Sequence, residues 1–499
     1  MMRSPQLKRL LPLTLLVTTL GCFAPQVVTN SNLPSTTPKP AFAAPSKAAK
    51  PAYAFVDSIC VNTHWYYDDT PYVQNYNAVK QKLVALGVRH IRDGGTGDNV
   101  IAKLKELGRL GIKTTYIMNP DSGIAPNSSY WAADPAYNIT DFVKNKVGTN
   151  AIDAVEITNE IDLGYQKLFW RKGDKDKLNN DSNSPLYWVS YIQSLTKDTY
   201  KALKRDRATA QVKVIGPSLG GTYDYGNKSP LKDLSAVVDW GNFHPYPSGG
   251  NPFNNPFKYN TIEKYYWQGN FPSVNINNHP YAFDVYAPPF KGKPMAATET
   301  GYFTTKGEKG ISEKVHGKYM PRLFLEYFRQ GIPRTCSYEF VDEWNQPDNS
   351  EANYGLLRNN LSPKPAYTAL KNLISVLSDP AGSKIISRAL NYNLSFKAPP
   401  GYDRTEYVHD LLLQKRDGNF YLVLWHEISN GDRSVTPVRE INPPPMPTQL
   451  NLSTPIRSAT VYTLDDAGNM SSKAASIKSN KISLNVTDKA TIIKLVPRK

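Results

Sequence analysis

Two glutamates, Glu160 and Glu299, stand at the ends of short apolar segments and have polar neighbours. The first closes the run Glu156-Ile157-Thr158-Asn159-Glu160, and the second lies within Ala297-Thr298-Glu299-Thr300-Gly301. A pair of carboxyl groups can cleave a glycosidic bond, because one protonates the leaving oxygen while the other attacks the sugar or activates water. These residue types therefore indicate acid–base and nucleophilic chemistry on an acetal.

Two further segments end in residues that could assist such a pair. They are Arg92-Asp93-Gly94-Gly95 and Phe243-His244-Pro245-Tyr246. An arginine or a tyrosine hydroxyl can hold a neighbouring carboxylate in its ionised form. Arg92 could instead form a salt bridge with Asp93 or with Glu156, and we interpret Glu156 as a buried and paired structural carboxylate. His244 and Tyr246 could equally be packing residues.

The elements that must position these residues alternate between strand and helix from residue 54 to residue 377. Apolar residues recur at helical spacing between the strands, and Gly87 and Gly111 stand where C-cap glycines belong. Eight units over about 320 residues fit a (β/α)8 (TIM) barrel or a doubly wound sheet. The eightfold count and the lack of a G-x-G-x-x-G run favour the barrel, whose active site lies at the carboxyl ends of its strands. The strand candidates are Phe55–Val61, Arg89–Arg92, Lys113–Met118, Ala154–Thr158, Val212–Ile215, Val238–His244, Pro294–Thr298 and Arg334–Phe340.

From about residue 381 the pattern changes to short alternating segments separated by Gly, Pro and Asn. Asp417-Gly418 is a hairpin signal, and a proline-rich loop is expected at Pro443–Pro447. This part of the chain predicts an all-β sandwich. The strand candidates are Tyr407–Gln414, Asn419–His426, Ala459–Leu464 and Ile482–Val486. The expected organisation is a signal peptide (1–22), a linker (23–52), the barrel (53–380) and the sandwich (381–499).

The N-terminus predicts export. Basic residues precede an apolar run, Leu10–Leu20, that is too short to span a membrane with these flanks. Two processing routes compete: lipidation at Cys22 in an imperfect lipobox, or cleavage after Ala41-Phe42-Ala43. We favour the lipoprotein, tethered to a membrane through Cys22. The location expected is extracellular, periplasmic or lipid-anchored at the envelope.

The chain is basic, with 59 Lys and Arg against 43 Asp and Glu and a formal charge of +16. These charges are scattered along the sequence rather than clustered, which argues against a nucleic-acid partner. An acidic polysaccharide or an anionic envelope surface fits such a balance better. We expect a monomer.

Only Cys60 and Cys336 follow the predicted linker, so no disulfide framework is implied. In the barrel they would lie on the first and last strands, which are neighbours. A bridge is one alternative, but we favour two buried thiols.

No His or Cys cluster has metal-binding spacing, and no cofactor is inferred. An acidic loop offers calcium-type oxygen ligands without a recognised calcium spacing, so we interpret it as solvated. Its residues are Asp342, Glu343, Asp348, Asn349 and Glu351.

In these motifs the sequence resembles clan A of the glycoside hydrolases, and most of all its family 39-type members, from residue 54 to residue 498. Asn159-Glu160 is similar to the Asn-Glu pair that ends the fourth strand, and Glu299 to the nucleophile that ends the seventh. Arg92 and the His244-x-Tyr246 motif also match. Further similarity covers Tyr338–Asp342, Tyr354–Leu357 and Pro363–Tyr367.

This resemblance implies a retaining β-glycosidase. Glu160 would be the acid/base, with a pKa raised by the charge of Glu299. Glu299 would be the nucleophile, kept ionised by Arg92 and Tyr246, and Asn159 would bind the sugar's 2-hydroxyl. The carboxyl groups should lie about 5–5.5 Å apart. Many relatives have proline after the Asn-Glu pair, whereas this chain has Ile161-Asp162, which weakens assignment to a subfamily.

Aromatic residues near the strand ends are further candidates for sugar binding. His64 and Trp65 follow the first strand and Trp344 follows the eighth, where each could contact sugar or pack at the rim. A lid-like insertion is expected between the sixth and seventh strands. The remaining tryptophans are expected in the core or on the surface away from ligand: Trp170, Trp188, Trp240, Trp267 and Trp425.

Two rival functions stay open on the same barrel. One is a non-catalytic envelope protein that binds polysaccharide, and the other is a transglycosylase, in which a sugar replaces water as the acceptor. The identity of the sugar does not follow from the sequence, because barrel loops set specificity.

Overall fold

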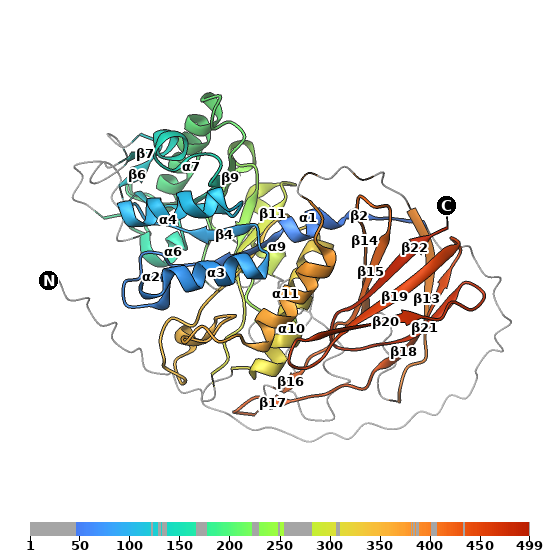
Figure 1. Cartoon of the computed structure of the whole chain (residues 1–499). Coiled ribbons are helices and arrows are strands. Elements are labelled where there is room, and N and C mark those ends of the chain that lie inside the picture. The colour runs from blue at the N-terminus through green and yellow to red at the C-terminus, as the bar shows by residue number, and fades with distance from the viewer. Residues whose placement is uncertain are drawn as a thin grey trace, which may run out of the picture. The chain divides into compact units, whose positions relative to one another are not determined.

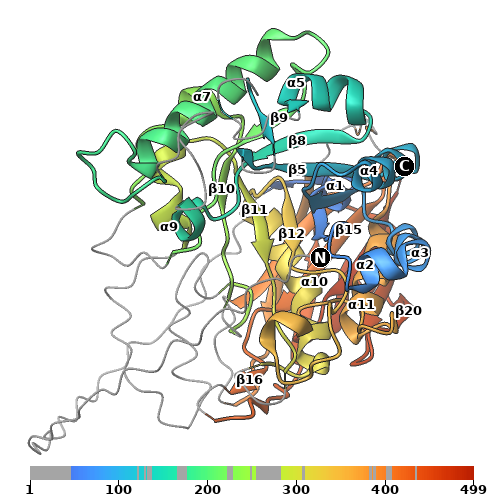
Figure 2. The same cartoon turned by 90° about the vertical axis from the view of Figure 1, so that its left-hand side faces the viewer.

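Eight parallel strands form the central sheet of the computed structural model, in the order β10-β11-β12-β3-β4-β5-β8-β9. A parallel bridge between Ile215 and Trp240 joins β9 to the start of β10, so the sheet closes on itself and the predicted barrel is confirmed (Figure 2). The strands are β3 (Ile59–Asn62), β4 (His90–Asp93), β5 (Lys113–Met118), β8 (Ile152–Ile157), β9 (Lys213–Ile215), β10 (Gly241–Phe243), β11 (Met295–Thr300) and β12 (Thr335–Ser337). The structure describes residues 46–120, 123–127, 131, 137–165, 177–221, 229–247, 250–253, 282–305, 310–380, 382, 385, 389–400, 407–432 and 435–498.

The first predicted strand, Phe55–Val61, is wrong in its first half. Residues Ala52–Asp57 form helix α1, and the strand begins only at Ile59. Both segments are short, apolar and buried, and periodicity alone does not separate a buried helix from a buried strand at this length.

Helices surround the barrel strands, and α7 lies outside β8 and β9 (Figure 2). The predicted C-cap glycine Gly87 ends α3 with a φ of 84°, a left-handed conformation that glycine adopts without strain. The α-helices are α2 (Pro71–Gln74), α3 (Tyr76–Leu86), α4 (Asp98–Arg109), α5 (Ile139–Asp141), α6 (Ile161–Gly164), α7 (Trp188–Arg205), α9 (Ala282–Tyr286), α10 (Glu313–Arg329) and α11 (Pro365–Leu377). Shorter π or 3-10 turns are η2 (Phe142–Val147), η4 (Ser235–Val237), η5 (Pro288–Phe290) and η6 (Ser350–Asn353), and a two-stranded ladder pairs β6 (Ile124–Ala125) with β7 (Tyr137–Asn138).

The predicted C-terminal sandwich is confirmed as two packed sheets, of orders β1-β13-β18-β21 and β2-β14-β15-β22-β19-β20. Leu390, Leu422 and Leu450 are among the residues that form the core between them. The strands are β1 (Ser46–Ala48), β2 (Lys50–Pro51), β13 (Ala389–Phe396), β14 (Val408–Gln414), β15 (Phe420–His426), β18 (Met446–Leu452), β19 (Ile456–Leu464), β20 (Met470–Ala475), β21 (Lys481–Val486) and β22 (Thr491–Pro497), with a separate pair β16 (Gly431–Asp432) and β17 (Arg439–Glu440).

Two sequence boundaries need correction. The predicted linker 23–52 ends too late, because β1 pairs with β13 and β2 pairs with β14. Its proline-rich composition hid these strands, and Pro51 is tolerated because β2 is an edge strand. The predicted loop at Pro443–Pro447 ends earlier than expected, since Met446 begins β18 and Pro447 pairs with Asn485.

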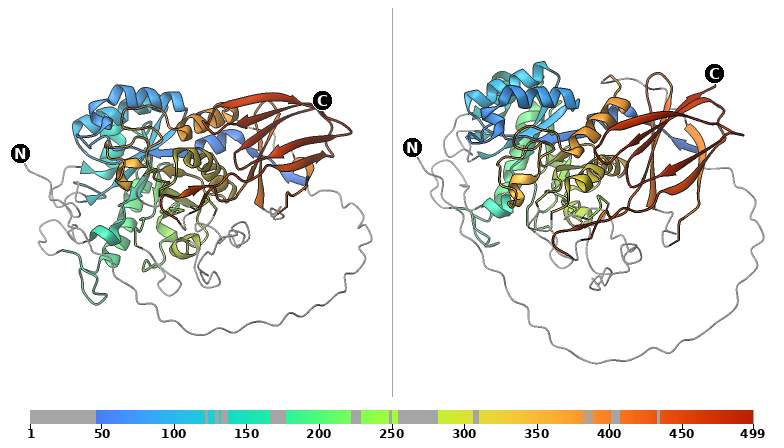
Figure 3. Two further views of the ribbon diagram at one scale, coloured as in Figure 1. Left: turned by 90° about the horizontal axis from the view of Figure 1, so that it is seen from below. Right: turned by 60° about the horizontal axis from the view of Figure 1, so that its bottom comes forward.

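The barrel and the sandwich share one apolar core along α10 and α11, which lie between the barrel strands and the six-stranded sheet (Figure 1). The orange and red C-terminal strands lie together beside the blue-to-yellow barrel in both views of Figure 3. A stripe of charged residues on α10 crosses this interface. Lys318 binds Asp488, Arg322 binds Glu427 and Glu326 binds His409.

Several sequence predictions fall outside the described residues. They are the signal peptide with Cys22, most of the linker, Trp170, Trp267 and most of the insertion between β10 and β11. Trp188 and Trp425 are buried as expected, and Trp240 is partly buried. Within the part of the chain that the structure describes, no helix combines the length and apolar character that a membrane crossing requires.

Candidate active site

The strand ends bring the predicted residues together at one rim of the barrel. Arg92 lies in β4, Glu160 three residues after β8, His244 directly after β10 and Glu299 in β11. Since all eight strands are parallel, their carboxyl ends share this rim. The sequence pattern therefore placed these four residues correctly.

Glu299 is held by two donors. Arg92 Nη1 lies 2.6 Å from Glu299 Oε1, and the Tyr246 hydroxyl donates to Oε2 at 3.1 Å. Only 9% of the residue is exposed. Both hydrogen bonds hold the carboxylate in a fixed position at the rim.

Arg92 is the centre of the polar network. It is 2% exposed and binds Glu156 in a bidentate pair, with Nε–Oε2 at 2.6 Å and Nη2–Oε1 at 2.8 Å. Burial alone would lower the pKa of Arg92, but the charges of Glu156 and Glu299 raise it. The predicted structural role of Glu156 is thus confirmed, and Arg92 binds the structural carboxylate and Glu299 at once.

Two asparagine side chains accept the other hydrogen bonds of Arg92. Nη2 donates to Asn159 Oδ1 at 2.7 Å, and Nη1 donates to Asn62 Oδ1 at 2.9 Å. Asn62 in turn donates to the backbone oxygen of Thr298. Sequence reading missed Asn62 because the first strand was ended one residue early, at Val61.

His244 lies between the two glutamates. Its Nδ1 is 2.7 Å from Glu160 Oε1 and 3.5 Å from Glu299 Oε2, while its Nε2 lies 3.0 Å from Thr298 Oγ1. An oxygen of Glu160 and an oxygen of Glu299 lie within 4.8 Å of each other. His244 is therefore a contact of both carboxylates rather than a packing residue.

The expected rise in the pKa of Glu160 is wrong for this arrangement. Burial does raise it, but the hydrogen bond and charge of His244, together with Arg92, bring the pKa below its ordinary value. The pKa of His244 changes in the opposite sense: burial lowers it, but Glu299 and Glu160 raise it above its ordinary value. The proton of this pair thus resides on the imidazole, and Glu160 is ionised.

The aromatic candidates at the rim have different environments. Trp65 is 1% exposed and packs edge-on against Tyr72 and Tyr76, so its burial supports the packing alternative, and its role as a sugar contact stays a prediction. Its apolar ring packs in the core beneath the rim. Trp344 is partly exposed on the loop after β12 and donates to Asp69, and its role as a sugar contact stays a prediction.

His64 belongs to a second acidic group beside the first. Its Nδ1 lies 2.5 Å from Glu343 Oε1 and 3.3 Å from Glu339 Oε2, and Tyr67 stacks on its ring. Burial alone would lower the pKa of His64, but both glutamates raise it. Burial raises the pKa of Glu339 to about 8. A sugar contact by His64 stays a prediction.

This group also corrects the view of the acidic loop as solvated. Glu343 is buried against His64, and buried Asp342 binds Lys364 Nζ at 2.8 Å and the backbone N–H of Gly355. The local sequence does not reveal these partners, because Lys364 lies 22 residues from Asp342 and His64 lies 279 residues from Glu343. Only the outer part of the loop, with Asp348, is exposed.

Among the residues that the structure describes, three groups of histidine and acidic residues have atoms close enough to hold a metal ion: Glu160 with His244 and Glu299, His64 with Glu339 and Glu343, and Glu326 with His409 and Glu427. In each group the histidine binds a carboxylate directly. The groups are therefore accounted for by ion pairs, and we assign no metal to them.

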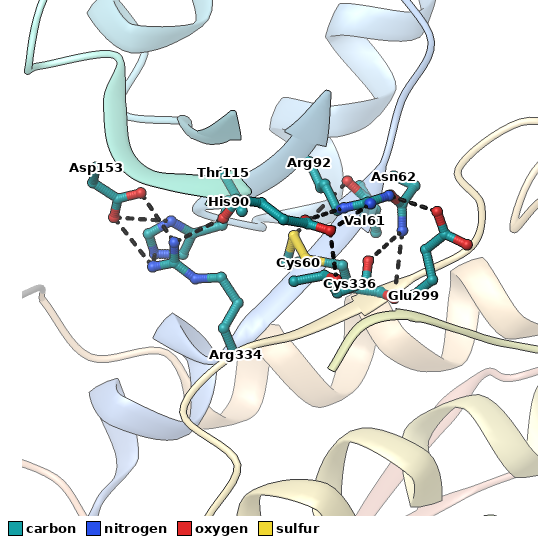
Figure 4. The surroundings of a disulfide bond; sticks show 12 residues. Cys60, Val61, Asn62, His90, Arg92, Thr115, Asp153, Glu299, Arg334 and Cys336 are labelled. Carbon is teal, nitrogen blue, oxygen red and sulfur yellow. Dashed lines mark hydrogen bonds and ion pairs between the residues drawn. A yellow bond between two sulfur atoms is a disulfide. The ribbon is translucent and has the colours of Figure 1, made fainter. Parts of the chain in front are cut away.

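A disulfide joins Cys60 and Cys336, so the preference for two free thiols was wrong. The two residues face each other in the ladder between β3 and β12. Figure 4 shows the bridge between Asn62, Arg92 and Glu299 on one side and the ion-pair network of Arg334, Asp153 and His90 on the other. The bridge therefore links the two strands directly below the site.

No protein-family model matches the sequence, and no curated protein matches it. Solved structures do match. The GH39 enzyme from Xanthomonas axonopodis pv. citri is 14% identical with a TM-score of 0.50, covering 90% of this chain and 96% of that one. The catalytic domain of GH30 xylanase C from Talaromyces cellulolyticus is 11% identical with a TM-score of 0.50, covering 90% and 99%.

A 4-O-α-L-rhamnosyl-β-D-glucuronidase from Fusarium oxysporum is 13% identical with a TM-score of 0.50, covering 91% of this chain and 99% of that one. At these identities the matches establish the fold. The chain thus has the barrel-plus-sandwich fold of the family 39 and family 30 glycoside hydrolases, as the sequence resemblance implied.

Proposed function

We propose that the protein is a retaining β-glycosidase that hydrolyses O-glycosidic bonds of a poly- or oligosaccharide. The observation that carries this proposal is the pair of carboxylates at the rim, Glu160 and Glu299, with oxygens within 4.8 Å of each other. Retaining enzymes hold their carboxyl groups about 5–5.5 Å apart, whereas inverting enzymes leave room for water at about 6.5–9.5 Å. The short separation supports the retaining mechanism.

In the first step Glu299 attacks the anomeric carbon, and Glu160 protonates the departing oxygen as the glycosidic C–O bond breaks. The proton comes from His244 Nδ1, which lies 2.7 Å from Glu160 Oε1. A glycosyl ester on Glu299 results, and the charge on its carboxylate is lost. Arg92 and Tyr246 hold the attacking carboxylate in place before that.

In the second step Glu160 takes a proton from water, which attacks the anomeric carbon and breaks the ester. Glu299 returns to its ionised form and the configuration is retained. Asn159, held by Arg92 Nη2, is the residue we assign to the sugar's 2-hydroxyl. That hydrogen bond would strengthen as the oxocarbenium-like transition state forms.

We propose an anionic glycan as the substrate class, because the chain carries a formal charge of +16. Digestion of a glycan panel that contains acidic and neutral members, followed by product analysis, tests this choice. Release of sugar only from neutral members would contradict the anionic class while leaving the reaction itself intact.

The reaction is tested with Glu299→Gln and Glu160→Gln on activated aryl β-glycosides. Each substitution should reduce hydrolysis by about 10³-fold or more, since each removes a group that reacts directly. Azide should restore turnover of the Glu160→Gln variant alone, because it attacks the glycosyl-enzyme without a general base. Full activity in both variants would refute the assignment, and glycan binding with no release of sugar by the wild type would favour a non-catalytic binding protein.

We also propose that the mature protein is exported and tethered through a lipid on Cys22. A Cys22→Ala variant should then move from the membrane fraction to the soluble fraction. An unchanged distribution would instead favour cleavage after Ala43.

A further inference from the structure

The backbone that carries Glu160 is held in a sparsely populated conformation. Glu160 has φ 42° and ψ 52°, and Thr158 has φ 56°, both in the left-handed region. A residue other than glycine costs about 1–2 kcal/mol there and persists only where its surroundings fix it. The turn after β8 therefore depends on contacts from outside the turn.

One such contact comes from the segment after β9. The Glu160 backbone N–H donates to Ser218 Oγ at 3.1 Å, and Ser218 Oγ donates to Glu156 Oε1 at 3.2 Å. Ser218 is buried. The turn of Glu160 is thus connected to the buried carboxylate that also orients Arg92.

The same segment forms a wall against the Glu160 carboxyl group. A Cβ atom placed on Gly220 would lie 2.6 Å from Glu160 Cδ and 2.8 Å from Glu160 Oε2. Real Cβ atoms do not approach so closely, so only glycine fits without displacing the carboxylate. The Glu160 carboxyl group thus has His244 at Oε1 and Gly220 close beside Oε2.

Asp162 holds the backbone of this segment in place through hydrogen bonds. It lies two residues after Glu160 in α6, and its Oδ1 accepts the N–H of Gly220 at 2.8 Å while its Oδ2 accepts the N–H of Gly221 at 2.7 Å. The Tyr286 hydroxyl donates to the carbonyl oxygen of Gly221 at 2.6 Å. Hydrogen bonds to an ionised carboxylate are stronger than neutral ones, and Asp162 makes one to each of the two glycines.

We propose that Asp162 is the positioning residue of the acid/base: by clamping Gly220 and Gly221 it fixes the rotamer of Glu160 against His244. This inference rests on the proposed role of Glu160. A second effect follows from charge. The negative charge of Asp162 disfavours ionisation of Glu160 and raises its pKa, which opposes His244 and helps Glu160 to accept the proton.

Two substitutions distinguish the hydrogen bonds of Asp162 to the two glycines from the effect of its negative charge on Glu160. Asp162→Asn removes the charge and places an N–H₂ group where a backbone N–H needs an acceptor. Asp162→Glu keeps the charge but moves the carboxylate by one methylene. The matched control is Asp206→Asn, because Asp206 also accepts a backbone N–H, from Ala208, on the loop before β9 at the opposite end of the barrel.

The first measurement does not require turnover. Hydrogen–deuterium exchange of the peptide that contains Gly220 and Gly221 should be at least about tenfold faster in both Asp162 variants, because Asn offers an acceptor to only one of the two N–H groups and the Glu carboxylate is displaced from both. The Asp206→Asn variant should exchange like the wild type there. Exchange at the wild-type rate in both Asp162 variants would contradict the proposal that Asp162 holds Gly220 and Gly221.

The second measurement uses phenyl and 2,4-dinitrophenyl β-glycosides, which differ in how much the leaving oxygen needs a proton. Both Asp162 variants should lose about tenfold or more in kcat/KM on the phenyl substrate and much less on the dinitrophenyl one. Only Asp162→Asn should also move the basic limb of the pH profile to lower pH. If Asp162 were only structural, its substitution would reduce kcat/KM equally on both substrates and leave the pH profile unchanged. That outcome would overturn the proposal.

The Glu160→Gln variant, measured in the same assay, distinguishes failure of the proposed function from failure of the positioning role of Asp162. If it keeps full activity on the phenyl substrate, the proposed function fails and the role of Asp162 with it. If it loses that activity while both Asp162 variants keep it, only the positioning proposal is overturned.

Discussion

Arg92 binds Glu156 through two of its nitrogens, and both side chains are buried beneath the rim of the barrel. The third nitrogen, Nη1, is thereby directed at Glu299. A planar guanidinium fixed on one edge by a bidentate pair has little freedom left at the other. The buried pair thus acts as the support that presents a donor to the nucleophile.

Removal of Glu156 should therefore destabilise the fold as well as the site. A Glu156→Ala variant leaves Arg92 in the interior without its main counter-charge, and breaking a buried pair in this way costs about 3–5 kcal/mol. The free energy of unfolding from urea titration measures the loss. Asp206→Ala, which removes the partner of the exposed Lys144, is the control and should barely move the midpoint. Equal effects of the two changes would contradict the supporting role of Glu156.

The hydroxyl of Tyr246 should matter for rate and not for folding. Tyr246→Phe removes one hydrogen bond to Glu299, and a hydrogen bond to a charged group is worth about 1.5–3 kcal/mol. We expect kcat/KM to fall about 10- to 100-fold with little change in melting temperature. Tyr76→Phe is a matched control, because that hydroxyl also donates to a glutamate, Glu106, but between α3 and α4. A wild-type rate in Tyr246→Phe would remove this residue from the mechanism.

The pH dependence of kcat/KM should report His244. The pKa of His244 is raised and that of Glu160 lowered, so the pair keeps one proton until the pH rises through the pKa of His244. Catalysis needs that proton and should fail above this pH. In His244→Gln the proton can reside only on Glu160, and the basic limb should move about 2 units to lower pH, because the ordinary pKa values of histidine and glutamate differ by about that much. An unchanged basic limb would show that the limb belongs to another group.

The features that could be predicted from the sequence are those with a repeating local pattern. Regular alternation of strand and helix revealed the barrel, and the polar residues that end buried strands revealed Arg92, Glu160, His244 and Glu299. These features are local, because a strand end is visible from the few residues around it. The sandwich was visible for the same reason.

Features that depend on partners far apart in sequence were missed or misread. Trp65 looks like a rim residue until the packing of Tyr72 and Tyr76 is known. The pKa of Glu160 depends on His244, which lies 84 residues away. Gly220 carries no signal at all, since it is the side chains of Glu160 and Leu163 beside it that leave no room for a Cβ atom unless they shift.

The bridge between Cys60 and Cys336 offers a test of the barrel closure itself. It joins neighbouring strands that are 276 residues apart in sequence, so it restricts the unfolded chain strongly. A Cys60→Ala/Cys336→Ala double variant should lose about 2–5 kcal/mol in unfolding free energy. It should also lose activity, because Asn62, two residues beyond Cys60, orients Arg92. Thiol labelling of the denatured, unreduced protein should modify neither cysteine, and labelling of both would show that the thiols are free.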